Sequence, residues 1–356
     1  MQLNNIYKKI FRPLFYPASI IYFIVVFFRN YLYNIKLLPI YKVPPKVISI
    51  GNITAGGTGK TPIVIALAKV LSKKGFKISI LSRGYLRKTK GTLLVSNGKK
   101  TLCEWKDCGD EAYMLSHKLT NIPIAVDENR YRGGIYLTRH FKPDIILLDD
   151  AFQHRKLYRD FDLIIIDSND TIKKHKLLPL GILREPWNNI ARRADSLFIT
   201  KGIPNDYLKK KLENTSAPIF NIKTNPSLSK NYNNTKNQIQ TNEGVLLLSG
   251  IGNNSFFKKT ASYLGLYILQ HEKYKDHFSF TKKDIIRIEN KAKKIGAKYI
   301  VTTEKDWVRI EQLKPKFSYA IIEIDMKIEK EKKFLNYLNK KLNLRHSPSK
   351  NNSNKS

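Results

Sequence analysis

Short apolar runs alternate with longer mixed segments along most of the chain. In its first part, five runs that we interpret as strands cover residues 47–52, 77–81, 144–150, 162–167 and 196–200. Continuous apolar stretches of this length are typical of strands that are buried on both faces. A segment with helical spacing, residues 61–74, lies between the first two runs and ends at Gly75. This alternation predicts an α/β fold, a parallel sheet with helices on both faces.

A second alternation follows a polar, low-complexity stretch. Its strand-like runs cover residues 245–252, 266–270, 299–303 and 318–324, and its helical segments cover 256–264 and 282–295. This pattern predicts a second, smaller α/β domain. We therefore expect an N-terminal membrane-associated anchor at 1–35, a core domain at 36–224, a linker or long loop at 225–243, a second α/β domain closing over the active site at 244–345, and a disordered tail at 346–356.

The N-terminal apolar run covers residues 14–28 and follows the basic residues Lys8, Lys9 and Arg12. Its fifteen residues fall short of the roughly 20 that a membrane-spanning helix needs. No small-residue cleavage site follows the run, which argues against a signal peptide. Basic flanks and many aromatic residues favour a helix that lies on an anionic membrane surface. A buried core helix and a spanning helix remain the alternatives.

The charge composition of the chain is consistent with an anionic membrane surface as its partner. The chain has 356 residues, 64 Lys+Arg and 29 Asp+Glu, for a net charge of +35. No acidic residue precedes Glu104, so the excess is concentrated near the N-terminus. Such a charge suits nucleic acid, an anionic membrane or a phosphorylated ligand. Most of the basic residues are Lys, whereas base readers favour Arg, and no helix-turn-helix or zinc-finger spacing is present. We therefore expect no nucleic-acid partner. Cys103 and Cys108 are interpreted as free thiols.

The turn between the first strand and the first helix reads GNITAGGTGKTP at residues 51–62. Its end matches a P-loop, whose backbone N–H groups bind nucleotide phosphates. Thr54 stands where the usual spacing has its first glycine. Lys60 is expected to reach the β- and γ-phosphates, and Thr61 to ligate Mg²⁺. The expected nucleotide-binding residues are Thr54, Ala55, Gly56, Gly57, Thr58, Gly59, Lys60 and Thr61.

A P-loop enzyme needs a second magnesium ligand at the end of a neighbouring strand. The apolar run at residues 144–150 ends in Asp149 and Asp150. Either carboxylate is a candidate metal ligand, directly or through water. The sequence thus predicts an enzyme that uses ATP and Mg²⁺.

Several motifs, in order, resemble those of the tetraacyldisaccharide 4′-kinases, the lipid A 4′-kinases of Gram-negative bacteria. Besides the P-loop they are SRGY at 82–85, GDE at 109–111, Arg130, DDAFQHR at 149–155, LGxLREP at 180–186, SGIGN at 249–253, DHF at 276–278 and TEKD at 303–306. Ala151 and Asn254 depart from the family pattern, which usually has Gly and Pro there. Neither change removes a chemical group.

The resemblance implies transfer of the ATP γ-phosphate to the 4′-hydroxyl of a tetraacylated glucosamine disaccharide 1-phosphate, forming lipid IVA. The reaction would take place at the cytoplasmic face of the inner membrane, with the protein peripheral or monotopic there. Lys60 would be catalytic, and Asp110 would be the base, paired with His277 across the domain cleft. Candidate substrate contacts are Tyr85, Arg130, His154, Arg184 and Glu185. Another P-loop small-molecule kinase or an ATPase is the alternative.

Overall fold

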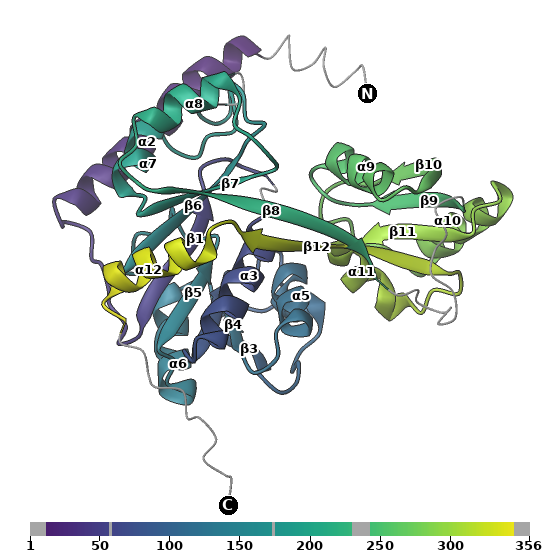
Figure 1. Ribbon diagram of the computed structural model, residues 1–356, viewed down its shortest axis with the longest axis horizontal. Coiled ribbons are helices and arrows are strands. Elements are labelled where there is room, and N and C mark those ends of the chain that lie inside the picture. The colour runs from purple at the N-terminus through teal and green to yellow at the C-terminus, as the bar shows by residue number, and fades with distance from the viewer. Residues whose placement is uncertain (1–11, 57–58, 173–174, 230–242, 345–356) are drawn as a thin grey trace, which may run out of the picture. The chain divides into compact units, whose positions relative to one another are not determined.

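The computed structural model describes residues 12–56, 59–172, 175–229 and 243–344 (Figure 1). Contacts divide the chain into two units that each combine separate segments. Unit 1 contains residues 1–83, 127–223 and 327–356, and unit 2 contains 84–126 and 224–326. This division differs from the contiguous domains that the sequence predicts. Residues 84–126 group with unit 2 because the helix that begins at Asp110 packs against the helix that begins at Glu304.

Unit 1 is built on a parallel sheet. Its strands are β1 (Lys46–Asn52), β2 (Ile78–Ser82), β5 (Ile145–Asp149), β6 (Phe161–Asp167), β7 (Ser196–Thr200) and β8 (Ile219–Leu228). They lie in the order β8-β7-β6-β1-β5-β2, and every neighbouring pair is parallel. All five residues of β2, β5 and β7 are buried, as expected for strands covered on both faces.

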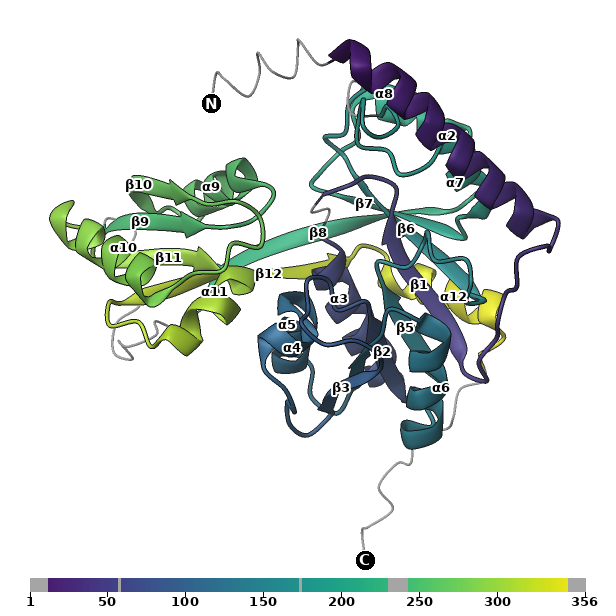
Figure 2. The same cartoon turned by 180° about the vertical axis from the view of Figure 1, so that it is seen from behind.

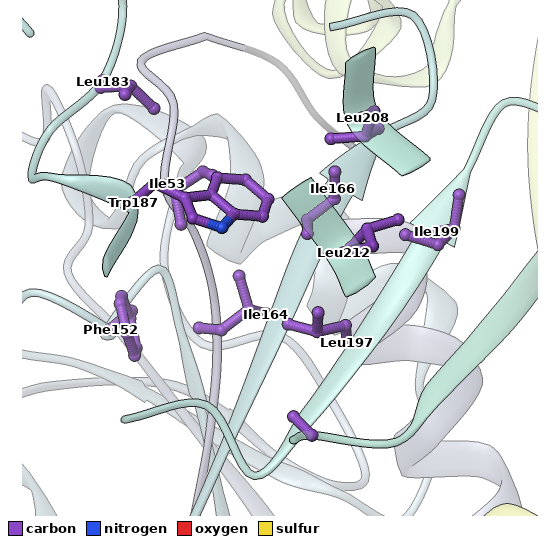
Figure 3. Close-up of a cluster of buried hydrophobic side chains, with 11 residues drawn as sticks. Ile53, Phe152, Ile164, Ile166, Leu183, Trp187, Leu197, Ile199, Leu208 and Leu212 are labelled. Carbon is purple, nitrogen blue, oxygen red and sulfur yellow. The ribbon is translucent and has the colours of Figure 1, made fainter. Parts of the chain in front are cut away.

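Helices cover both faces of this sheet. They are α2 (Arg12–Asn34), α3 (Lys60–Lys73), α6 (Arg130–Phe141), α7 (Trp187–Arg193), α8 (Asp206–Glu213) and α12 (Glu331–Leu342). Trp187 and Leu208 pack with Ile164 of β6 in one buried cluster (Figure 3). On the opposite face, Phe334 of α12 packs against Phe161. The predicted parallel sheet with helices on both faces is confirmed.

The N-terminal helix α2 is longer than the apolar run from which it was predicted. It has 23 residues, and the stretch Phe15–Asn34 is long and apolar enough to cross a membrane by length and composition alone. Only 17% of its most apolar 18-residue window is buried, so α2 is not a core helix. In Figures 1 and 2 it runs along the outside of unit 1.

Unit 2 contains a parallel sheet and an antiparallel pair. Its strands are β3 (Leu93–Asn97), β4 (Pro123–Val126), β9 (Gly244–Ser249), β10 (Tyr267–Lys273), β11 (Tyr299–Thr303) and β12 (Tyr319–Ile328). Its helices are α4 (Trp105–Cys108), α5 (Asp110–Lys118), α9 (Asn254–Tyr263), α10 (Lys282–Lys294), α11 (Glu304–Ile310) and the short 3₁₀ helix η1 (Glu311–Leu313). The parallel strands lie in the order β10-β9-β11-β12, and β3 pairs with β4 antiparallel.

Alternate residues of the parallel strands in unit 2 contribute to two hydrophobic cores, one on each face of the sheet. Leu246 and Ile300 pack with Ile288 of α10, whereas Leu247 and Val301 pack on the other face with α9. The second α/β unit predicted from the sequence is therefore present. The predicted linker, however, begins within β8, which continues to residue 228. Its remaining residues, 230–242, and the predicted tail lie outside the described part of the chain.

Candidate active site

The P-loop begins at the carboxyl end of β1 and ends at the N-terminus of α3. Gly59 precedes the helix with a φ of 80°, a left-handed conformation that glycine adopts without steric cost. Lys60 and Thr61 are the first two residues of α3, where unpaired backbone N–H groups attract anions. Thr54 and Ala55 precede them in the loop, and the N–H of Ala55 donates to the Ile182 carbonyl at 2.7 Å. Gly57 and Thr58 lie outside the described residues.

The Lys60 ammonium lies among oxygen atoms from two neighbouring strands. It is 3.3 Å from Asn52 Oδ1 at the end of β1 and 3.5 Å from Asp150 Oδ1 just beyond β5. Only 12% of its side chain is exposed. These partners hold the cation at the edge of the sheet where α3 begins.

Asp149 and Asp150 occupy the end of β5 as predicted. Asp149 is the last residue of the strand and is 2% exposed. Asp150 has a φ of 49°, which is costly for a residue with a Cβ and often marks a functional site. Arg184 donates to Asp150 Oδ1 at 2.9 Å. Burial alone would raise the pKa of Asp150, but the charges of Lys60 and Arg184 outweigh it and lower the pKa.

The residues at this edge fit a magnesium ion. Ile50 of β1 is in register with Asp149 of β5, so Thr61 and the two carboxylates come from adjacent elements at the same end of the sheet. Hydroxyl and carboxylate oxygens are ligands that Mg²⁺ prefers, and phosphates complete its coordination. Within the described ranges no group of three or more His, Cys, Asp and Glu could hold a metal.

Arg130 is buried in unit 1, and His154 is half-buried there. Arg130 begins α6, is 2% exposed, and donates to the Asp127 carbonyl. Burial, helped by the charge of Arg83, lowers the Arg130 pKa to about 10. Burial and the charge of Arg130 lower the pKa of His154 to about 4, so His154 is neutral at pH 7. Its Nε2 is buried and has no hydrogen-bond partner among the described residues.

Glu185 is fully buried and holds α2 against unit 1. It accepts hydrogen bonds from Asn30 Nδ2 at 3.2 Å and from Arg193 Nη1 at 2.7 Å. Two further hydrogen bonds join α2 to the segment that precedes α7. Ser19 donates to the Leu177 carbonyl, and Tyr22 donates to the Arg184 carbonyl. The sequence predicts Glu185 as a substrate contact, whereas its partners here are protein groups that anchor a helix.

The predicted pair of Asp110 and His277 is formed, and it lies within unit 2. His277 Nδ1 is 3.0 Å from Asp110 Oδ2. Both residues belong to the same unit, so the expectation that the pair forms across a domain cleft was wrong. The pair forms because α5, which begins at Asp110, packs on α11. The ring of Tyr85 meets the His277 imidazole edge-on, with centroids 5.3 Å apart.

Asp110 is buried and surrounded by positive charge. Its Oδ1 accepts from the Glu111 N–H at 2.9 Å, and Arg309 Nη1 is 3.8 Å from its Oδ2. Burial alone would raise the pKa of Asp110. The hydrogen bond from His277 and the charges of Lys305 and Arg309 outweigh burial, so the pKa lies below its usual range.

A buried ion pair holds the loop that carries His277. Asp306 Oδ2 accepts from the Gly250 N–H at 3.0 Å, and Arg309 Nη2 donates to both Asp306 Oδ1 and the Gly250 carbonyl. That carbonyl also accepts from the His277 N–H at 3.1 Å. His277 itself has a φ of 58°, an uncommon left-handed conformation that this network maintains.

Comparison with known proteins is consistent with this geometry. The model of the tetraacyldisaccharide-1-P 4′-kinase family matches residues 11–343. The tetraacyldisaccharide 4′-kinase of Aquifex aeolicus is 35% identical over 321 residues, 89% of this chain and 95% of its own. That of Chlorobium phaeobacteroides is 37% identical over 307 residues, 83% of this chain and 85% of its own. The chain belongs to the tetraacyldisaccharide-1-phosphate 4′-kinase family.

A solved structure supports the same assignment. The crystal structure of the "apo" form of LpxK from Aquifex aeolicus in complex with ATP has a TM-score of 0.72 and 32% identity, and the match covers 92% of this chain and 98% of that one. The expected function is therefore confirmed. The chain is an ATP-dependent kinase that phosphorylates the 4′-position of a tetraacyldisaccharide 1-phosphate in lipid A synthesis, with ATP and Mg²⁺.

In this tetraacyldisaccharide 4′-kinase, the structure also reveals residues that sequence reasoning left without a role. Arg193 pairs with buried Glu185, Arg309 pairs with buried Asp306, and Lys305 contacts His277. The TEKD motif at 303–306 was noted in the sequence, but nothing in it indicated which side chain would face the dyad. Arg193 and Arg309 lie outside every motif. Arg309 is identified by its burial, and Arg193 by its ion pair with buried Glu185.

Proposed function

We propose that Asp110 accepts the proton of the sugar 4′-hydroxyl while residues of the P-loop and of the end of β5 hold the nucleotide, so that lipid IVA is formed. The observation that carries this proposal is the hydrogen bond between buried Asp110 and His277, at 3.0 Å. A sugar hydroxyl is a weak nucleophile, and a positioned base assists it as the bond to phosphorus forms.

The nucleotide-binding role rests on the start of α3. Thr54, Ala55, Gly56 and Gly59 shape the loop, and the amides of the first turn of α3 can bind a phosphate. Lys60 is held at this edge by Asn52 and Asp150 and supplies positive charge to the β- and γ-phosphates. We include Gly57 and Thr58 in this loop from the sequence alone.

Thr61, Asp149 and Asp150 are the proposed magnesium ligands. When bound, Mg²⁺ neutralises charge on the phosphates. Asp150 also pairs with Arg184, and that pair fixes the carboxylate at the edge of the sheet before nucleotide arrives. Preorganised groups of this kind stabilise developing charge without reorganisation during the reaction.

The depressed pKa of Asp110 suits the reaction. Phosphoryl transfer passes through a loose transition state in which the nucleophile needs little deprotonation before the bond forms. The carboxylate therefore orients the hydroxyl and takes its proton late. His277 donates to Oδ2, and the Glu111 N–H donates to Oδ1, so both oxygens are held in place. Orientation of this kind is a large part of such catalysis.

Arg130, Arg184, Tyr85 and His154 are the proposed contacts to the disaccharide headgroup. A guanidinium binds phosphate through two parallel hydrogen bonds, which suits the 1-phosphate of the substrate or the phosphates of ATP. His154 is neutral, and its buried Nε2 can exchange a hydrogen bond with a sugar hydroxyl. We propose that Glu185 does not contact the substrate and instead fixes the loop that carries Arg184.

We propose that α2 rests on the cytoplasmic face of the inner membrane with one side docked on unit 1. The docked side carries Ser19, Val26 and Asn30, which are all buried. The opposite side exposes large apolar residues, Ile21 at 62%, Ile24 at 45% and Phe28 at 57% among them. A helix docked along its length by hydrogen bonds favours a monotopic arrangement over a spanning one.

An assay with radiolabelled ATP and the disaccharide 1-phosphate in detergent micelles tests the catalytic proposal. Lys60→Ala and Asp110→Asn should each reduce kcat/KM by about 100-fold or more, because each removes a group that acts in the transition state. Lys209→Met is a matched control, since Lys209 forms only an exposed pair with Asp206 on α8. Activity of Asp110→Asn equal to that of the control would refute the assignment of the base.

A flotation assay with vesicles that contain phosphatidylglycerol tests the membrane proposal. Replacing Ile21, Ile24 and Phe28 together with Gln should reduce vesicle binding by on the order of 1,000-fold or more, since each buried apolar side chain contributes roughly 1.5–3 kcal/mol. Ile286→Gln, at an exposed apolar position of α10, is the control. Equal binding by the triple variant and the control would exclude this face as the anchor.

A further inference from the structure

Lys305, the second residue of α11, contacts the imidazole of His277 on the side away from Asp110. Its Nζ is 3.0 Å from His277 Nε2, 3.1 Å from Glu111 Oε1 and 3.7 Å from Asp276 Oδ1. About 20% of the side chain is exposed. The imidazole is therefore placed between the Asp110 carboxylate at Nδ1 and an ammonium group at Nε2.

The chemistry of the two neighbours determines where the imidazole proton lies. An ammonium group has three N–H donors and no lone pair, so it can only donate to Nε2. Nε2 must then carry no proton, and the single proton of the ring is on Nδ1, which donates to Asp110. Burial alone would lower the pKa of Lys305, but Glu111, Asp110 and Asp276 outweigh it and raise the pKa. Lys305 is therefore charged at neutral pH.

We propose that Lys305 is a positioning residue that keeps Nε2 of His277 unprotonated, so that Asp110 faces a neutral imidazole. A second proton on the ring would lie against the ammonium group, at 3.0 Å, and is disfavoured by like-charge repulsion. This inference rests on the proposed function, in which Asp110 is the base.

The charged groups around His277 explain why Lys305 is needed. Asp110 contacts the imidazole from α5, Asp276 precedes His277 in its own loop, Glu111 of α5 pairs with Lys305, and Arg309 approaches Asp110 from α11. The ring of Tyr85 is an uncharged neighbour of the imidazole. Without Lys305, Nε2 would keep the Asp276 carboxylate at 3.8 Å and lose the ammonium group that repels a second ring proton, which favours an imidazolium ion.

An imidazolium beside Asp110 would oppose catalysis. It would stabilise the carboxylate form of Asp110 across a 3.0 Å hydrogen bond and make the carboxylate a poorer acceptor for the sugar proton. The charge of Lys305 itself lowers the pKa of Asp110, but it lies beyond the imidazole ring, whereas an imidazolium would place a full positive charge directly across the hydrogen bond. Lys305 thus limits the positive charge next to Asp110 without touching the substrate, by acting through His277.

The test uses the full chain in detergent micelles, with ¹⁵N-labelled histidine, and reads the ring nitrogens of His277 by NMR. His277→Gln identifies the signal. At pH 7 the wild type should show an unprotonated Nε2 and a protonated Nδ1, whereas Lys305→Met should show both nitrogens protonated. Lys305→Arg should retain the wild-type pattern. Unchanged signals from the histidines outside the dyad show that each variant is folded.

Kinetics supply the second readout. Lys305→Met should lower kcat by about 10- to 100-fold at pH 7 and recover towards wild type in alkaline buffer, where the imidazolium proposed for this variant loses its proton. Lys305→Arg should remain within about threefold of wild type. Lys118→Met is the matched control, because Lys118 of α5 pairs with Glu304 and Glu323 and does not contact the dyad. It should change neither the His277 signals nor the pH profile.

Two results would overturn the inference. One is a protonated Nε2 in the wild type at pH 7, and the other is a loss in Lys305→Met that is the same at every pH between 6 and 9. Failure of the proposed function is separate, because it would appear as full activity of Asp110→Asn, whereas the NMR measurement needs no substrate.

Discussion

The buried pair of Asp306 and Arg309 allows a sharp prediction about stability. Both side chains are withdrawn from solvent, with exposures of 0% for Asp306 and 1% for Arg309. Arg309→Met keeps an unbranched apolar stem but leaves the Asp306 carboxylate without its cation. Removing one partner of a buried pair typically costs about 3–5 kcal/mol, because the remaining charge stays desolvated.

The predicted loss of stability depends on pH, and the direction of that dependence follows from the pKa of Asp306. Burial raises the pKa of Asp306, and the Arg309 charge is the largest effect that opposes the rise. Arg309→Met therefore raises this pKa further. A carboxyl whose pKa is raised by folding destabilises the fold as pH increases from the unfolded value through the folded one. The variant should lie closest to wild type near pH 4 and lose most stability near pH 7.

Thermal unfolding in detergent, followed at several pH values, measures this effect. A loss of about 3 kcal/mol corresponds to a Tm lower by roughly 6–12 °C for a unit of this size. Arg287→Met is the matched control, since Arg287 forms an exposed pair with Asp284 at the same i,i+3 spacing on α10. The control should lose under about 1 kcal/mol.

The double-mutant cycle completes the test. Asp306→Asn combined with Arg309→Met should recover part of the loss, because no buried charge remains without a partner. A Tm decrease for Arg309→Met that equals the Arg287→Met control, or one that does not vary with pH, would refute the reasoning.

Three further predictions follow from the site. Gly109→Ala should lower kcat and Tm together, because Gly109 has a φ of 89° and a Cβ there would lie 2.8 Å from the Tyr85 carbonyl oxygen; activity equal to wild type would contradict this. Glu185→Gln should cost roughly 1–3 kcal/mol in thermal unfolding, since it leaves the half-buried Arg193 without its anion; an unchanged Tm would contradict this. The lowered pKa of Asp110 predicts that kcat/KM stays constant down to about pH 5 and falls only in more acidic buffer; an acid limb near pH 6 would contradict this.

The sequence by itself located the predicted nucleotide-binding loop. A P-loop is a local structure, because its amides, Lys60 and Thr61 follow one another along the chain from a strand to a helix. Asp149 could also be located, since a continuous apolar run that ends in carboxylates places them at the edge of a parallel sheet. The extended order of family motifs then indicated the acceptor, which no single motif could specify.

The pairing of Asp110 with His277 was decided by tertiary structure. Asp110 and His277 are 167 residues apart, and their hydrogen bond depends on the packing of α5 against α11 within one unit. Sequence reasoning placed the pair across two contiguous domains, because it could not see that residues 84–126 group with the later segment.

Burial separated residues of the same type into different roles. Glu185 and Asp150 are both acids within family motifs, yet Glu185 is buried against α2 while Asp150 meets Lys60 at the edge of the sheet. Lys305 is one of many lysines in a strongly basic chain, and only its 3.0 Å approach to His277 distinguishes it. Local pattern predicts what neighbouring residues do together, whereas the protonation of a dyad depends on charges that only folding brings near it.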